Sequence, residues 1–133
     1  MAEILDIIDE DGNLLGFSQD RKLVHEQGLL HHASGIILLN KINGQWCMLS
    51  QQRSKNKDKN AGLWDMSASG HVPSGQTPEE SLQREIKEEL GLNISSKHFT
   101  LLGKFWRNEA YNDGKFIENE LIYIYALKIL TLR

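Results

Sequence analysis

Residues 77–91 carry a start signal, a stop signal and an apolar period for one helix. Thr77-Pro78-Glu79-Glu80 is a capping box with proline at the first helical position, and Gly91 stands where a helix ends. The apolar positions recur at i, i+4 and i+8, at Leu82, Ile86 and Leu90. The sequence therefore predicts an amphipathic helix over residues 78–90 that buries one stripe against the rest of the domain.

Short apolar runs on both sides of this helix predict strands. They cover residues 2–8, 14–17, 31–40, 45–51, 100–106 and 116–130, and Asn43-Gly44 between two of them indicates a hairpin. A short helix is expected over residues 19–27, capped by Ser18 and ended by Gly28. Because strands outnumber helices and the longest helix is central, we expect a layered α/β domain. The length of 133 residues fits one domain, residues 1–133.

Composition excludes several classes of protein. The net charge of −3, without a dominant basic patch, argues against nucleic-acid binding. The apolar runs fall short of the roughly 18 residues of a membrane span, and the first residues lack the pattern of a signal peptide. The single cysteine, Cys47, excludes an internal disulfide. We therefore expect a cytoplasmic protein that does not associate with membranes.

Three glutamates of the predicted helix share one face. Glu85, Glu88 and Glu89 are spaced i, i+3 and i+4, next to the buried stripe, and would repel one another. A hard divalent cation such as Mg²⁺ or Mn²⁺ is the natural counter-charge, because it prefers carboxylate oxygen. The alternative is a solvated acidic face without a ligand.

The surrounding residues favour the metal. The segments Gly70-His71-Val72-Pro73-Ser74-Gly75-Gln76 and Arg84-Glu85-Ile86-Lys87-Glu88-Glu89-Leu90-Gly91-Leu92 resemble the Nudix box, G-x5-E-x7-R-E-U-x-E-E-x-G-U with U aliphatic. Only Gln76 departs from that pattern, where the family has glutamate. The resemblance implies metal-assisted hydrolysis of a small-molecule diphosphate. It also implies that Glu88 and Glu89 are metal ligands, that Glu85 is a ligand or base, that Arg84 orients the glutamates, and that the Ser69 carbonyl joins the coordination.

A wider resemblance covers most of the chain. The runs Gln52-Arg53-Ser54-Lys55, residues 62–71 and Ile117-Glu118-Asn119-Glu120 are similar to the type I isopentenyl-diphosphate isomerases and their Nudix hydrolase relatives. In the isomerases three histidines and two glutamates hold one metal. The matching residues here are His25, His31, His71, Glu118 and Glu120, with Glu120 also expected to be catalytic. Arg53 and Lys57 match basic positions that contact the diphosphate.

The histidines and glutamates at these five positions predict a second metal site. Glu118 and Glu120 are two apart on a predicted strand, so both side chains point to the same side. Imidazole nitrogen favours Mn²⁺ or Zn²⁺ over Mg²⁺, so the two sites should differ in preference. The alternative is that each histidine is structural, as we expect for His32 and His98. Trp106 and Tyr111 are weaker candidates for stacking on a substrate base or alkyl tail.

Ser69 separates the two activities of this family. The isomerases have a catalytic cysteine at this position, and a serine hydroxyl is a far poorer proton donor or acceptor than a thiol. The intact Arg84–Glu89 segment also favours hydrolysis. Isopentenyl-diphosphate isomerase stays open as an alternative, as does a non-catalytic diphosphate-binding module, which Gln76 favours.

The resemblance implies a Nudix-like α/β/α sandwich with a mixed sheet. Nudix domains carry a further helix after the strand that contains Glu118, and here the C-terminal helix is missing from the sequence. One sheet face would then be open. The sequence leaves two interpretations of this open face, a truncated chain or a homodimer.

Overall fold

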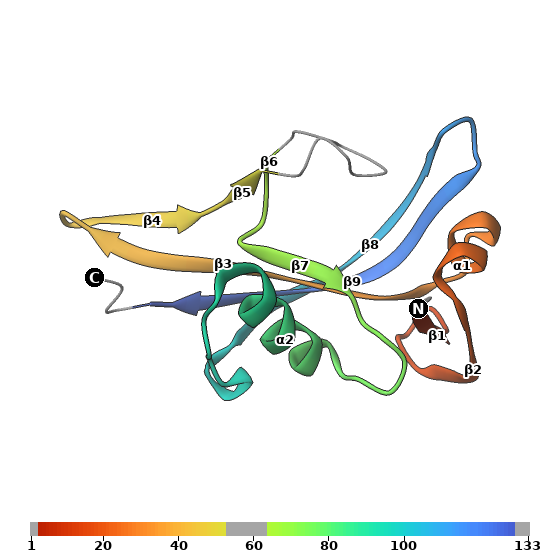
Figure 1. Ribbon diagram of the computed structural model, residues 1–133, viewed down its shortest axis with the longest axis horizontal. Coiled ribbons are helices and arrows are strands. Elements are labelled where there is room, and N and C mark those ends of the chain that lie inside the picture. Colours follow the sequence, from red (N-terminus) through yellow and green to blue (C-terminus); the bar gives the residue numbers. More distant parts are fainter. Residues whose placement is uncertain (1–2, 53–63, 130–133) are drawn as a thin grey trace.

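The computed structural model describes residues 3–52 and 64–129 (Figure 1). The helices are α1 (Arg21–Gln27), α2 (Pro78–Leu90) and the 3₁₀ turn η1 (Ser96–His98). The strands are β1 (Ile4–Ile8), β2 (Leu14–Asp20), β3 (His31–Ile42), β4 (Gln45–Leu49), β5 (Gln51–Gln52), β6 (Trp64–Asp65), β7 (Ala68–His71), β8 (Thr100–Tyr111) and β9 (Phe116–Lys128).

The long strand β3 is the centre of a seven-stranded sheet. Its parallel neighbour is β9, whereas β1, β7 and β4 pair with it antiparallel, in that order along its other edge. β2 extends the sheet beyond β1, and β8 extends it beyond β9. The sheet is therefore mixed, as expected, and Figure 1 shows α1 and α2 at different places along it.

Strand register assigns each side chain to one of two faces, because successive residues alternate. One face packs under α2 in a core of buried side chains: Ile36, Leu38, Ala68, Leu82, Ile86, Tyr125 and Leu127. The opposite face carries His31, which pairs in register with Glu120. There Val24 of α1 packs on Leu5 and Ile7 of β1. Helices on both faces give the α/β/α sandwich that the sequence predicts.

Helix α2 has the predicted bounds because both of its ends are capped. Thr77 Oγ1 accepts the Glu80 N–H at 3.2 Å, and Glu80 Oε1 accepts the Thr77 N–H at 3.3 Å. At the other end Gly91 is left-handed, with φ of 71°, and its N–H donates to the Lys87 carbonyl. The predicted capping box and glycine stop are both confirmed.

The predicted start of the first helix is wrong. Ser18 lies within β2 and pairs with Asp6, so it is not a cap. Asp20 caps α1 instead, and its side chain accepts the Leu23 N–H at 2.9 Å. Local sequence does not separate two capping residues that are two positions apart, and the pairing of β2 with β1 decides between them.

Other differences concern the strands. β8 continues past Trp106 to Tyr111, since its pairing with β9 extends to the hairpin turn. The predicted strand over residues 45–51 is divided between β4 and β5, and β7 was not predicted. The last described element is β9, and no helix follows it within residues 64–129. None of the helices in the two described ranges is long and apolar enough to cross a membrane.

Candidate metal centre

Two carboxylates of β9 lie on the same face of the sheet, as their spacing predicts. Glu118 is completely buried, and Glu120 is 5% exposed. Ionised carboxylates are almost never buried without partners that offset the loss of hydration. The partners of these two are imidazoles from three different elements.

His25 of α1, His31 at the start of β3 and His71 at the end of β7 converge on Glu118. The distances from their Nε2 atoms to Glu118 Oε1 are 3.3, 3.8 and 3.3 Å. One ligand atom from each of these four residues lies within 4.8 Å of all the others. Glu120 Oε2 joins them, 3.7 Å from His31 Nε2 and 3.5 Å from His71 Nε2. The fold thus brings together all five residues of the predicted second site.

Two of the three histidines, His31 and His71, have partners on their outer nitrogens that orient the rings. His31 Nδ1 lies 2.9 Å from the Leu29 carbonyl, so it carries the proton and turns Nε2 toward the glutamates. That Nε2 atom is buried without a hydrogen-bond partner. His71 Nδ1 lies 3.3 Å from Glu3 Oε1. Metal-binding histidines have this arrangement, in which the second nitrogen bonds a carbonyl or carboxylate. The residues therefore fit a divalent cation held by nitrogen and oxygen.

Each charge in the cluster perturbs its neighbours. Burial alone would lower the pKa of His31, but Glu118 and Glu120 outweigh it and raise this pKa to about 9. The pKa of His71 is also raised, since Glu118 and Glu3 outweigh the effect of burial. Burial would raise the pKa of Glu118, but the three histidines hold it well below its usual range. Without a cation, the cluster thus retains protons on imidazole to balance its carboxylates.

Sequence reasoning did not identify Glu3 and Arg107 as neighbours of this cluster. Arg107 pairs with Glu120 across β8 and β9, and its Nη1 lies 3.9 Å from Glu120 Oε1. The two oxygens of Glu120 are therefore divided between a guanidinium and two imidazoles. Neither residue has a sequence signal, because both are brought near the cluster by the tertiary fold, Arg107 through its pairing with Glu120.

The three glutamates of α2 lie on the other face of the sheet. Register places Gly70 and His71 on opposite faces, and Glu85 packs over Gly70. Arg84 lies between two of the glutamates, with Nη1 3.1 Å from Glu88 Oε2 and Nη2 3.3 Å from Glu85 Oε1. Glu88 and Glu89 are exposed, whereas the side chain of Glu85 is only 16% exposed.

Burial, together with the charge of Glu89, raises the pKa of Glu85 to about 7, although Arg84 opposes this. Three carboxylates crowded on one helix face thus carry an electrostatic cost that a cation would relieve. Their oxygens form the type of donor set that hard cations prefer. These residues fit a divalent cation as well, by a different chemistry from the histidine cluster.

Gly70→Ala tests the contact between β7 and Glu85. An added Cβ would lie 2.7 Å from Glu85 Oε1, so the carboxylate must move. The Nudix resemblance implies that Glu85 is a metal ligand or base, and on that interpretation we expect turnover to fall by about tenfold or more, because small displacements of such groups are costly. Since the end of a glutamate is flexible, the free energy of unfolding should stay within about 1 kcal/mol of wild type. Gly103→Ala is the control, because its Cβ meets only Phe105 at 3.4 Å. Equal losses of turnover in both variants would contradict this role.

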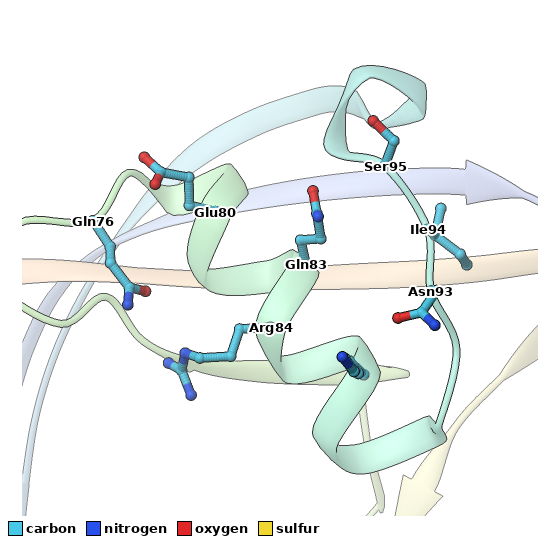
Figure 2. Close-up of a pocket in the computed structure, with 8 residues that line it drawn as sticks. Gln76, Glu80, Gln83, Arg84, Asn93, Ile94 and Ser95 are labelled. Carbon is cyan, nitrogen blue, oxygen red and sulfur yellow. The ribbon is translucent and has the colours of Figure 1, made fainter.

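A hollow of about 590 Å³ lies beside α2 (Figure 2). It is lined by Gln76, Glu80, Gln83, Arg84, Lys87, Asn93, Ile94 and Ser95. Gln76 Oε1, Arg84 Nε and Arg84 Nη2 are buried without hydrogen-bond partners. Gln76 is uncharged, so it cannot form an ion pair with Arg84, whose guanidinium lies near Glu85 and Glu88 instead.

The other residues considered in the sequence analysis lie outside the two groups described above. Ser69 lies on β7 between Ala68 and Gly70, and register puts its side chain on the face of His71. The ring of His32 packs edge-on against the ring of Tyr123, with the ring centroids 5.3 Å apart, and His98 is exposed in η1. Neither residue joins the cluster. Arg53 and Lys57 lie outside the described residues.

Comparison with known proteins identifies the family. The family model for the NUDIX domain matches residues 29–131. The chain belongs to the NUDIX family. Its relatives include proteins named as Nudix hydrolases and a protein named as an isomerase. Nudix hydrolase 3 of Arabidopsis thaliana is 37% identical over 96% of this chain and 16% of its own length. Isopentenyl-diphosphate Delta-isomerase of Serratia proteamaculans is 35% identical over 95% of this chain and 66% of its own length.

An uncharacterised Nudix hydrolase of Clostridium acetobutylicum is 34% identical over 95% of this chain and 60% of its own length. The chain thus spans less than two thirds of the length of these three relatives. Among solved structures, a Deinococcus radiodurans protein matches with a TM-score of 0.66 and 24% identity, over 98% of this chain and 74% of its own. The NUDIX domain of a Shewanella oneidensis protein, solved with ADP ribose, matches with a TM-score of 0.59 and 17% identity. The match covers 77% of this chain and 61% of that one. Both structures support the NUDIX fold.

Proposed function

We propose that the protein is a hydrolase that uses Mg²⁺ or Mn²⁺ to cleave a small-molecule diphosphate. The observation that carries this proposal is the position of Glu85, which is half-buried over Gly70 and linked through Arg84 to Glu88. Membership of the NUDIX family supports it, since Nudix enzymes generally use divalent metal ions.

The residues of α2 have separate tasks in this reaction. A bound cation would neutralise charge on the diphosphate and help to deprotonate the attacking water. Glu88 and Glu89 are exposed and so are accessible to a substrate that arrives from solvent. Arg84 restrains Glu85 and Glu88 through its two terminal nitrogens. Such preorganised charges avoid the cost of reorienting groups during the reaction.

The His25, His31, His71, Glu118 and Glu120 cluster is proposed as a second metal site. Its buried nitrogen donors suit Mn²⁺ or Zn²⁺ better than Mg²⁺. The unpartnered Nε2 of His31 and the convergence on Glu118 Oε1 support this assignment. Arg53 and Lys57 are proposed to contact the diphosphate, on the basis of their match to basic positions of the isomerases.

A substrate screen tests the proposed reaction. Nucleoside diphosphates, dinucleotides, nucleotide sugars and prenyl diphosphates are incubated with the protein and Mg²⁺ or Mn²⁺, and release of phosphate or nucleoside monophosphate is measured. We expect at least one class to be cleaved only with metal. Binding of a diphosphate without turnover of any class would contradict hydrolysis and favour a non-catalytic binding module.

The Serratia proteamaculans isomerase makes isomerisation of isopentenyl diphosphate the second candidate function. We expect no such activity, because Ser69 is a poor proton donor or acceptor near neutral pH. Incubation with isopentenyl diphosphate in deuterated water should leave the allylic positions unlabelled. A Ser69→Cys variant is the informative companion, since it restores the thiol. Labelling by wild type above a Glu120→Gln variant would favour isomerase over hydrolase.

A further inference from the structure

A second hollow, of about 530 Å³, lies beside the end of β1 and the middle parts of β8 and β9. It is lined by Ile8, Asp9, Glu10, Leu30, Trp106, Asn119 and Leu121. Register puts Trp106 opposite Leu121, and both alternate with Arg107 and Glu120. The hollow is therefore on the opposite face of the sheet from the histidine cluster, and it is separate from that centre.

Trp106 forms a rigid wall of this hollow. Its Nε1 donates to Asn119 Oδ1 at 2.7 Å, and Asn119 Nδ2 donates to the Gly28 carbonyl at 3.0 Å. The polar edge of the indole is thus satisfied within the protein. Nevertheless Trp106 is 68% exposed, so apolar ring surface faces solvent. An aromatic ring held in this way offers a stacking surface at little cost in conformational entropy.

Among the residues that the structure describes, those that line the hollow include apolar side chains and two carboxylates but no Lys, Arg or His. Asp9 Oδ1 accepts the N–H groups of Asp11 and Asn13, each at 2.9 Å, which orients that side chain in the turn. Glu10 stands beside it in the same turn. Phosphate would be repelled by these carboxylates. A ligand with N–H donors or positive charge would be attracted.

We propose that this hollow binds a flat aromatic ring that carries an amino or ammonium group. The ring stacks on Trp106 over Ile8, Leu30 and Leu121, and the amino group meets the carboxylates of Asp9 and Glu10. A nucleobase with an exocyclic amine and an arylalkylamine share this chemistry. The proposal is independent of the diphosphate hydrolase activity, because no lining residue belongs to either metal-binding group.

Titration of ¹⁵N-labelled protein with three probes tests this site. Tryptamine carries an ammonium group, indole-3-acetate carries a carboxylate on the same ring, and adenosine carries a neutral exocyclic amine. The indole N–H signals of Trp106 and Trp46 are assigned with tryptophan-to-phenylalanine variants. Trp46 is the internal control, since it is also exposed but lies near Lys41 and Lys128.

Tryptamine, adenosine or both should shift the Trp106 signal saturably and leave Trp46 unchanged, and the responding probe tells amine from nucleobase. Indole-3-acetate should bind about tenfold more weakly than tryptamine, because its charge is reversed. Trp106→Leu should weaken binding by about tenfold, as expected for a lost stacking and cation–π partner. Glu10→Gln should weaken tryptamine about fivefold, whereas Asp11→Asn in the same turn should not.

Several results would overturn the proposal. One is the absence of a saturable shift with both tryptamine and adenosine. Another is equal affinity for tryptamine and indole-3-acetate, which would exclude a role for the carboxylates. Unchanged tryptamine affinity in Glu10→Gln would also exclude a role for the carboxylates. This variant should fold normally, because Glu10 is exposed.

Discussion

Glu89→Gln is expected to lower the turnover of the proposed diphosphate substrate by more than about a hundredfold. This is the scale for the loss of one catalytic electrostatic partner. Glutamine keeps the size of the side chain but removes its charge from the face that it shares with Glu85 and Glu88. Since Glu89 is exposed, folding should be retained. Initial rates at saturating Mg²⁺, with circular dichroism on the same samples, measure both effects.

Glu26→Gln is the matched control for this prediction. Glu26 is an exposed glutamate on α1 whose partner is Lys22, at 4.0 Å. The same chemical change there should leave turnover within twofold, because α1 and the α2 glutamates lie on opposite faces of the sheet. Folding should also be retained, since a surface pair contributes about 1 kcal/mol or less to stability. Comparable turnover in Glu89→Gln and wild type would remove the α2 glutamates from the mechanism.

The double variant His25→Ala/His31→Ala is expected to lose high-affinity Mn²⁺ and Zn²⁺ binding at the cluster. Affinity should fall by more than about a hundredfold, because loss of direct donors exceeds the 10–100-fold cost of losing an outer partner. When a chelator removes the metal, the free energy of unfolding of the double variant should be about 3 kcal/mol lower than that of wild type, since Glu118 is left buried with fewer partners. Metal titration calorimetry and urea unfolding measure these changes.

Two further variants make this prediction decisive. His71→Gln removes a donor that is 17% exposed and therefore spares the core, and it should weaken the same metals. His98→Ala removes an exposed histidine outside the cluster, and it should change neither affinity nor stability. Unchanged metal stoichiometry in the double variant and in His71→Gln would mean that these histidines are structural.

Local sequence determined the features whose causes are local. Helix α2 begins at Pro78 and ends at Leu90 because the capping box and Gly91 act within one turn of each end. The spacing of Glu85, Glu88 and Glu89 follows from the helical period alone. The common face of Glu118 and Glu120 follows from the period of a strand, so it too could be predicted.

Tertiary structure decided everything that depends on strand pairing. The antiparallel ladder of β8 and β9 brings Arg107 to Glu120, and it locks Trp106 to Asn119. The chain reversal before β3 supplies the Leu29 carbonyl that orients His31. The burial that makes Glu85 unlike Glu88 comes from its contact with Gly70 of β7, a strand without a sequence signal. Such contacts join residues far apart in the chain, and their free energy depends on the packing of the whole sheet rather than on any one segment.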